Sequence, residues 1–227
     1  MKKIDILFVV FSACFSFGLG YFLRDKWFLG SITLFFGCLQ NLFMRRRLWF
    51  EEFAGLAETL VSASVCFFSG LFGSSVFSLL VYVPLAVFSI ACWKKNQSGG
   101  KVQLNKMTTE RAAAVVTLVL VFTSAISAGL AFLPGQNLPV FDAATNILDI
   151  AGIVLIALRF KEGWICWFVC EVVELVMWAL MIQKGSGNAM MMIVTCSTYL
   201  VLYVWGFASF AQATKKQQKM ASRLKVA

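Results

Sequence analysis

Carboxylates and tryptophans share one helical face in the second half of the chain. Steps of 3, 4, 3 and 4 residues place their side chains on a single stripe of an α-helix. A charged residue near the centre of a bilayer costs at least ~2.5–3.5 kcal/mol, so its presence indicates a functional site. Because aromatic rings one turn away offer flat stacking surfaces, the stripe predicts a binding site for a flat, polar or cationic molecule. The stripe comprises Trp164, Trp167, Glu171, Glu174 and Trp178.

Four carboxylates are predicted near mid-membrane, and no lysine or arginine is predicted at the same depth. They are Glu58, Asp149, Glu171 and Glu174. Such groups cannot all be ionised in an apolar core, so some must be protonated or face water. The sequence therefore favours a cationic or strongly hydrogen-bonding ligand, with protons as the competing candidate. Glu174 and Asp149 also fit a simpler role, as protonated carboxyls hydrogen-bonded to a neighbouring helix.

Further polar residues extend the candidate site. Asp142, Asn146 and Asp149 lie at i, i+4 and i+7, so they share a helix face that leads from the outer mouth toward the centre. This face predicts the lining of an access path. Neutral hydrogen-bonding groups are expected from Gln40, Asn41, Tyr82, Tyr199 and Tyr203.

The tryptophans have an alternative role as interfacial anchors of a membrane protein. Trp164 lies at the start of its span and fits the cytoplasmic belt, whereas Trp167 is one turn deeper and fits ligand stacking better. Trp178 fits the outer belt or packing within the bundle. Three more tryptophans lie at span ends, where belt residues are common: Trp27, Trp49 and Trp93.

The composition requires a membrane protein. Of the 227 residues, 60% are hydrophobic, and the mean hydropathy is +0.81, which excludes a soluble globular domain. Apolar runs of about 17–25 residues, each long enough to span a bilayer as a helix, recur between polar breaks. The eight predicted spans are 4–23, 27–44, 50–69, 74–93, 112–133, 141–159, 163–183 and 187–210. Because only the loop at 94–111 has any size, we expect a single all-α polytopic domain.

The net charge of +9 is explained by topology rather than by nucleic-acid binding. With eight spans and a cytoplasmic C-terminus, 17 of the 20 lysines and arginines lie on the cytoplasmic side, and Arg24, Lys26 and Lys184 lie outside. This distribution follows the positive-inside rule and predicts two cytoplasmic termini, contact with anionic lipid and no nucleic-acid partner. The first span resembles a signal peptide, but its apolar stretch continues through Leu23, so we expect it to be retained.

Neither metal nor cofactor is expected from the sequence. All seven cysteines fall inside predicted spans, where a thiol behaves as a small hydrophobic group, and no spacing suggests disulfides or zinc ligands. The chain contains no histidine, which removes the commonest metal ligand and the usual proton relay. An enzyme is disfavoured, because no nucleophile motif or metal-ligand cluster is found.

The order of spans suggests an internal repeat. An extra N-terminal helix (1–26) precedes a first triplet of helices (27–93), a loop and linker helix (94–133), and a second triplet with a basic tail (134–227). One linker helix between two triplets makes the repeats parallel, as in some transporters. Glu58 and Glu171 each lie eight or nine residues into the middle helix of a triplet, so we expect them at symmetric positions around a central site. Pro84 is expected to kink the fourth span, where neighbouring helices can satisfy the freed carbonyl.

The segment from Asp142 to Glu171 adds a family pattern. Asp142 opens a helix, Glu162-Gly163-Trp164-Ile165-Cys166-Trp167 follows, and a polar residue comes four positions later. In this pattern the chain resembles the nicotinamide riboside transporter (Pnu-type) family of bacterial vitamin transporters. That family shows an acidic residue two before the first Trp, a W-x-x-W pair, and usually Asn at the positions of Glu171 and Glu58. The last helix, with Tyr199, Tyr203 and Trp205, is similar in a looser way.

The resemblance covers most of residues 27–210 and implies a three-plus-one-plus-three bundle of the SWEET-like, sugar-facilitator type. It also implies facilitated diffusion of a vitamin precursor across the bacterial inner membrane, with trapping by a cytosolic kinase. The resemblance implies a cargo of the kind that this family carries: nicotinamide riboside, thiamine, riboflavin or deoxynucleosides. Because glutamate replaces asparagine at both symmetric positions, we expect a cationic heteroaromatic cargo, either nicotinamide riboside or a similar compound such as thiamine.

Two other functions stay open at this point. One is proton-coupled export of aromatic cations, and the other is a vitamin-binding membrane subunit that does not itself transport. The oligomeric state is also open, a homo-oligomer included.

Overall fold

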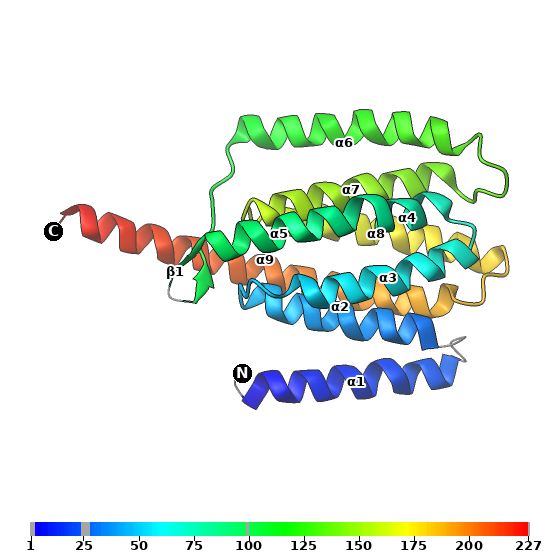
Figure 1. Cartoon of the computed structure of the whole chain (residues 1–227), viewed down its shortest axis with the longest axis horizontal. Coiled ribbons are helices and arrows are strands. Elements are labelled where there is room, and N and C mark those ends of the chain that lie inside the picture. Colours follow the sequence, from blue (N-terminus) through cyan, green and yellow to red (C-terminus); the bar gives the residue numbers. More distant parts are fainter. Residues whose placement is uncertain (1–2, 24–27, 99, 227) are drawn as a thin grey trace.

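Long helices run side by side along one axis in the computed structural model, which describes residues 3–23, 28–98 and 100–226 (Figure 1). The α-helices are α1 (Lys3–Leu23), α2 (Leu29–Arg45), α3 (Glu52–Phe68), α4 (Phe72–Phe77), α5 (Val83–Lys95), α6 (Thr109–Leu130), α7 (Pro139–Ala157), α8 (Gly163–Gln183) and α9 (Ala189–Val226). A π-helical turn, η2 (Ser78–Tyr82), joins α4 to α5, so these three form one continuous helical stretch. Two short strands, β1 (Gln97–Ser98) and β2 (Lys101–Val102), pair antiparallel after α5.

The helical stretches agree with the expectation of an all-α, multi-pass membrane protein. Within the described residues, six stretches are long and apolar enough to cross a bilayer. They are Asp5–Leu23, Phe72–Lys95, Thr109–Leu130, Pro139–Ala157, Gly163–Gln183 and Ala189–Met220. The other two predicted spans correspond to α2 and α3, which have 17 residues each and are shorter than these six.

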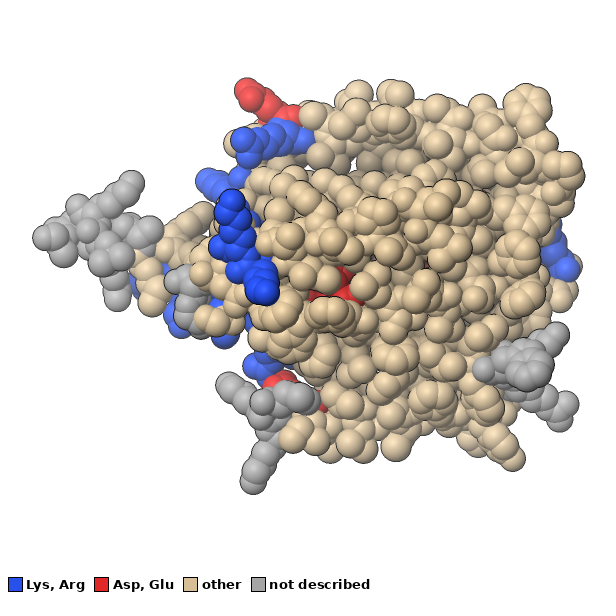
Figure 2. Space-filling model, in the orientation of Figure 1, with Lys and Arg blue, Asp and Glu red and all other residues tan. Residues whose placement is uncertain are grey.

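The outer helices present apolar side chains to their surroundings. α1 and α6 lie at opposite edges of the bundle (Figure 1). In α6 only Leu130 is buried, although the helix is strongly apolar. The lateral surface in Figure 2 is almost free of charge, as expected of a surface in contact with lipid tails.

Basic side chains gather at one end of the bundle (Figure 2). This end carries the start of α1, the strand pair and the C-terminal part of α9 (Figure 1). Arg46 forms an ion pair with Asp5 that ties α2 to α1, and the Arg45 guanidinium lies 3.4 Å from the centre of the Trp205 ring. Lys184 belongs to the opposite end, in the turn between α8 and α9, where its Nζ donates to Asn137 Oδ1 at 2.7 Å. The basic residues therefore mark one end, as the charge pattern predicted.

Local structure departs from the sequence expectations at several points. Where a kink was expected at Pro84, the structure has a π-helical turn just before the proline. The predicted loop after the fourth span contains the strand pair, and Val102 N donates to Arg47 O at 3.3 Å. The predicted basic tail is helical, because α9 continues to Val226 and extends beyond the bundle (Figure 1).

The prediction that Trp93 is an interfacial belt residue was wrong. Its side chain is fully buried in the core and its Nε1 donates to Ile156 O at 2.8 Å. Trp49 is partly buried, with the Lys94 ammonium 5.2 Å from its ring centre. Trp27 lies outside the described residues.

Candidate functional site

A polar cavity of about 110 Å³ lies inside the bundle. Its lining comes from α2, α3, η2, α5, α7, α8 and α9, and none of it from the described residues of α1 or α6. A water molecule needs roughly 10–15 Å³ of such space, so the cavity holds several waters or part of a small ligand. Six of the eight helical stretches therefore enclose one central site.

Five carboxylates line this cavity: Glu52, Glu58, Asp149, Glu171 and Glu174. Glu52 and Glu171 are buried, while the other three keep part of their surface accessible. Among the described residues of the lining there is no lysine or arginine. Because carboxyl groups so close together cannot all be ionised, the described lining favours a cation or a strong hydrogen-bond donor.

Glu52 was missed by the sequence reasoning. It was not among the carboxylates predicted near mid-membrane, yet it begins α3, is 6% exposed and lines the cavity. The neighbouring Glu51 is fully buried as well. The available signal was the pair of adjacent acidic residues directly before an apolar span.

An aromatic wall closes one side of the cavity. Trp167, Tyr199 and Tyr203 line it, and the Trp167 and Tyr203 rings stack with centroids 5.7 Å apart. Tyr199 Oη donates to Thr33 O at 3.0 Å, which links α9 to α2. Trp164 does not line the cavity: it is 1% exposed and meets Trp167 edge-on at 5.6 Å. The first tryptophan of the W-x-x-W pair therefore supports the second from behind.

Two glycines let the tryptophan rings approach neighbouring helices. A Cβ on Gly152 of α7 would overlap the Trp167 indole, and a Cβ on Gly206 of α9 would overlap the Trp164 ring. Because both indoles are buried, neither can move aside without cost. The position of Trp167 at the cavity wall thus requires glycine, which has no side chain, at residue 152.

Replacing Gly152 with Ala is expected to displace the Trp167 ring. Overpacking of this kind costs about 1–3 kcal/mol, so the variant should melt at a lower temperature and bind ligand more weakly than the wild type. Both are measured on purified protein in detergent. Gly18→Ala on α1 is the matched control, since nothing lies within 4 Å of the added Cβ, and it should alter neither quantity. A Gly152→Ala protein identical to the wild type would show that α7 and α8 can separate at no cost.

Neutral polar groups complete the lining. Gln40 and Asn41 both line the cavity, and Asn41 Nδ2 donates to Gly37 O at 2.8 Å. Tyr82 also lines it and donates from Oη to Asn146 Oδ1 at 2.9 Å. Asn146 itself lines a smaller cavity of about 50 Å³ that shares Asp149 and Glu174 with the main one.

Asp142 lies away from the main cavity and caps a helix instead. It is fully buried, and its carboxylate accepts hydrogen bonds from the backbone N–H groups of Gly73 and Ser74 at 3.0 and 2.9 Å. The Gln136 and Asn146 side chains donate to the same carboxylate at 2.7 and 3.0 Å. Asp142 therefore holds the N-terminus of α4 against α7, where a negative charge is favoured.

Trp178, the last residue of the predicted stripe, packs inside the bundle. It is 1% exposed and belongs to a buried apolar cluster with Met177, Met181 and Met192. Of the two roles left open for it, the structure supports bundle packing. The stripe is thus divided: Trp167, Glu171 and Glu174 face the main cavity, and Trp164 and Trp178 do not.

A multi-pass helical bundle with an apolar outer surface and a polar central cavity is the architecture of a small-molecule membrane transporter. The profile of the nicotinamide mononucleotide transporter family matches residues 27–212, and the chain belongs to this family. The resemblance found in the sequence is thereby confirmed, as is the expectation of a transporter rather than an enzyme.

Individual relatives agree with this membership. The chain is 27% identical over 198 residues to the nicotinamide riboside transporter PnuC of Neisseria mucosa, covering 85% of this chain and 74% of that protein. It is 24% identical over 200 residues to the nicotinamide riboside transporter PnuC of Haemophilus influenzae, covering 85% and 82%. The crystal structure of a vitamin B3 transporter PnuC has the same fold, with a TM-score of 0.81, 24% identity, and coverage of 95% of this chain and 94% of that one.

Proposed function

We propose that this protein carries a cationic heteroaromatic vitamin precursor, nicotinamide riboside or a close analogue such as thiamine, by facilitated diffusion. The observation that carries the proposal is a cavity lined by five carboxylates, with no basic side chain among the described lining residues. The names of the two bacterial relatives support the riboside as the first cargo to test.

The electrostatics of the cavity favour cations over anions. A pyridinium or thiazolium ring is attracted by carboxylates that are little screened inside a bundle. A phosphorylated nucleotide carries about two negative charges that the same carboxylates repel, so we favour the riboside over the mononucleotide. Neutral cargo such as riboflavin or a deoxynucleoside gains less from this lining.

The aromatic wall gives the cation a stacking surface. Trp167 stands at the cavity with Tyr203 stacked beside it, and a cation–π contact adds up to ~2 kcal/mol when desolvated. Glu171 on α8 and Glu58 on α3 would then pair with the charge or hydrogen-bond to the ring from the two halves of the bundle. Trp164 would act as a positioning residue for Trp167.

The proposed transport cycle uses two parallel triplets of helices. The first comprises α2, α3 and the α4–η2–α5 stretch, the second α7, α8 and α9, with α6 as linker and α1 as an extra helix. Support comes from the lining, to which both triplets contribute and the described parts of α1 and α6 do not. Rocking of one triplet against the other would open the central site to either side in turn.

The proposed orientation places both termini in the cytoplasm of a bacterial cell, with the basic end of the bundle inside. This follows from the gathering of lysines and arginines at that end (Figure 2). Because facilitated diffusion cannot concentrate its cargo, we also propose coupling to a cytosolic kinase that traps the imported compound as its phosphate.

Uptake into proteoliposomes that contain only the purified protein tests the function. We expect nicotinamide riboside or thiamine to enter, and riboflavin and deoxynucleosides to enter much more slowly. Thermal-shift measurements with the same four compounds provide a second readout, since a ligand stabilises the state that binds it. Preference for a neutral compound would contradict the cationic cargo, and no uptake of any compound would favour a binding subunit without transport of its own.

An imposed pH gradient separates facilitated diffusion from proton-coupled exchange. We expect uptake rates that do not depend on the gradient when the pH of the solution that contains the cargo is held constant. Rates that follow the gradient would favour the exporter, in which Glu171 or Glu174 exchanges a proton for the cation.

A further inference from the structure

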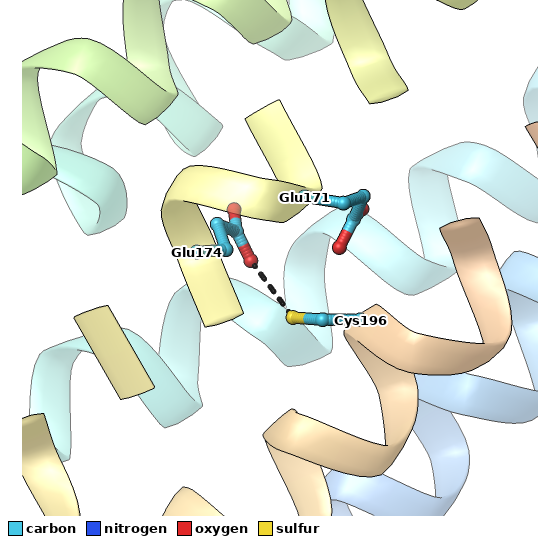
Figure 3. Close-up of side chains that lie close together, drawn as sticks. All are labelled: Glu171, Glu174 and Cys196. Carbon is cyan, nitrogen blue, oxygen red and sulfur yellow. Dashed lines mark hydrogen bonds between the residues drawn. The ribbon is translucent and has the colours of Figure 1, made fainter. Parts of the chain in front are cut away.

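Two carboxylates and a thiol converge between α8 and α9 at one side of the cavity (Figure 3). One ligating atom from each of Glu171, Glu174 and Cys196 lies within 4.8 Å of the others. Cys196 Sγ donates to Glu174 Oε2 at 3.4 Å, and the Cys170 thiol lies 4.0 Å from the other oxygen of the same carboxylate. Glu174 is thus placed between two sulfur atoms.

An unsatisfied buried oxygen points to a missing partner at this place. Glu171 is 6% exposed, its carboxylate is directed toward Glu174 and Cys196 in Figure 3, and its Oε2 has no hydrogen-bond partner among the described residues. Buried charges in proteins are paired with an opposite charge or coordinate a metal. In the part of the chain that the structure describes, no lysine or arginine lines the cavity to provide such a pair.

The ligand atoms determine which cation fits best. Magnesium and calcium take oxygen ligands, whereas zinc-type ions combine thiolate sulfur with carboxylate oxygen at about 2.0–2.3 Å. A divalent ion also offsets the charge of two carboxylates, which a monovalent ion does not. Coordination by the sulfur releases its proton to solvent.

We propose that Glu171, Glu174 and Cys196 bind one thiophilic divalent cation of the Zn²⁺ type inside the cavity, with the remaining coordination positions filled by water. The ligands come from two helices and are 22 residues apart at Glu174 and Cys196, so no spacing motif reveals them in the sequence. The bound ion occupies the carboxylates proposed to hold the cationic cargo, and it therefore inhibits uptake by competition. The competition rests on the proposed function, but the binding of metal does not.

Metal binding is measured on the purified full-length protein in detergent, without any vitamin. Titration with Zn²⁺ should give one tight site per chain, and Co²⁺ should give a thiolate-to-metal absorption band in the near ultraviolet. Cys196→Ser and Glu174→Gln should each weaken Zn²⁺ binding at least about ten-fold, with the Co²⁺ band lost in Cys196→Ser. Cys14→Ser, which removes an exposed thiol on α1, is the matched control and should bind as the wild type does.

Three results would overturn the proposal: no saturable Zn²⁺ binding, binding unchanged in both site variants, or binding weakened equally by Cys14→Ser. If Cys196→Ser does not fold, Glu174→Gln and the Co²⁺ spectrum of the wild type decide the matter. Competition is then tested in proteoliposomes, with the uptake rate of each protein compared with its own rate without metal. The Zn²⁺ concentration that halves uptake should be at least ten times lower for the wild type than for Glu174→Gln. Metal binding without inhibition would retain the site and contradict its overlap with the cargo.

Discussion

Glu171→Gln should reduce the uptake of nicotinamide riboside or thiamine at least about ten-fold while leaving the protein folded. The carboxylate is buried at the cavity, and one of its oxygens has no partner among the described residues. A hydrogen bond to a charged group contributes about 1.5–3 kcal/mol, and ~1.4 kcal/mol corresponds to a factor of ten in affinity. The amide keeps the shape of the side chain but removes the charge, so KM for a cationic cargo should rise in proteoliposome uptake.

Two further variants make this result specific. Glu110→Gln removes an exposed carboxylate at the start of α6, outside the cavity, and should not change uptake. Glu171→Asn introduces the residue that the resemblance assigns to most of the family, and it should shift the preference from cationic toward neutral cargo. Wild-type kinetics in Glu171→Gln would remove this residue from the binding site and leave Glu58 and Asp149 as the candidates for pairing with the cation.

The helices were predictable because each depends on a local property, an apolar run long enough to cross a bilayer. What could not be predicted depends on contacts between distant segments. The hairpin after α5 is fixed by contacts such as that of Val102 with the loop after α2. The full length of α9 was missed because hydropathy identifies only its membrane-spanning part, and the polar continuation is also helical.

The candidate site was predicted in composition but not in detail. Helical periodicity gave the face shared by Trp167, Glu171 and Glu174, and all three line the cavity. The same periodicity could not show that Trp164 lies behind Trp167 or that Trp178 packs into the core, since a stripe on a helix faces several neighbours along its length. Glu52 was missed because it lies close to the predicted end of its span. Its burial at the cavity depends on how α3 begins and packs, which the distance from the span end does not reveal.

Asp142 shows most clearly how the structure adds to a prediction made from residue type alone. An acidic residue at the mouth of a polar helix face predicted an access path, but the structure surrounds its carboxylate with hydrogen-bond donors of its own chain. Its donors are the backbone N–H groups of Gly73 and Ser74 and the side-chain amides of Gln136 and Asn146. The Ser74 hydroxyl also donates to it, at 2.5 Å. With its oxygens accepting these hydrogen bonds, the carboxylate links α4 to α7, and we expect it to hold these helices together rather than to contact the cargo.

Asp142→Ala is therefore expected to destabilise the protein strongly. Removing the acceptor leaves several buried donors without a partner, each of which costs about 1–3 kcal/mol, although such costs are not additive. A total loss of about 3–5 kcal/mol corresponds to a decrease of roughly 10 °C in the melting temperature of a protein of this size, measured in detergent without ligand. Asp142→Asn keeps one acceptor oxygen but turns an N–H₂ toward existing donors, so its stability should be intermediate.

The two possible roles of Asp142 differ in what the Asn variant loses. If Asp142 only holds α4 against α7, Asp142→Asn should lose stability and, at a temperature where it is folded, keep its KM for the cargo. If it instead contacts the cargo on the access path, the same variant should keep its melting temperature and show a raised KM. The first outcome is expected, because the cavity lining lacks Asp142. Its carboxylate instead accepts from Asn146, whose Oδ1 in turn accepts from Tyr82 at the cavity wall.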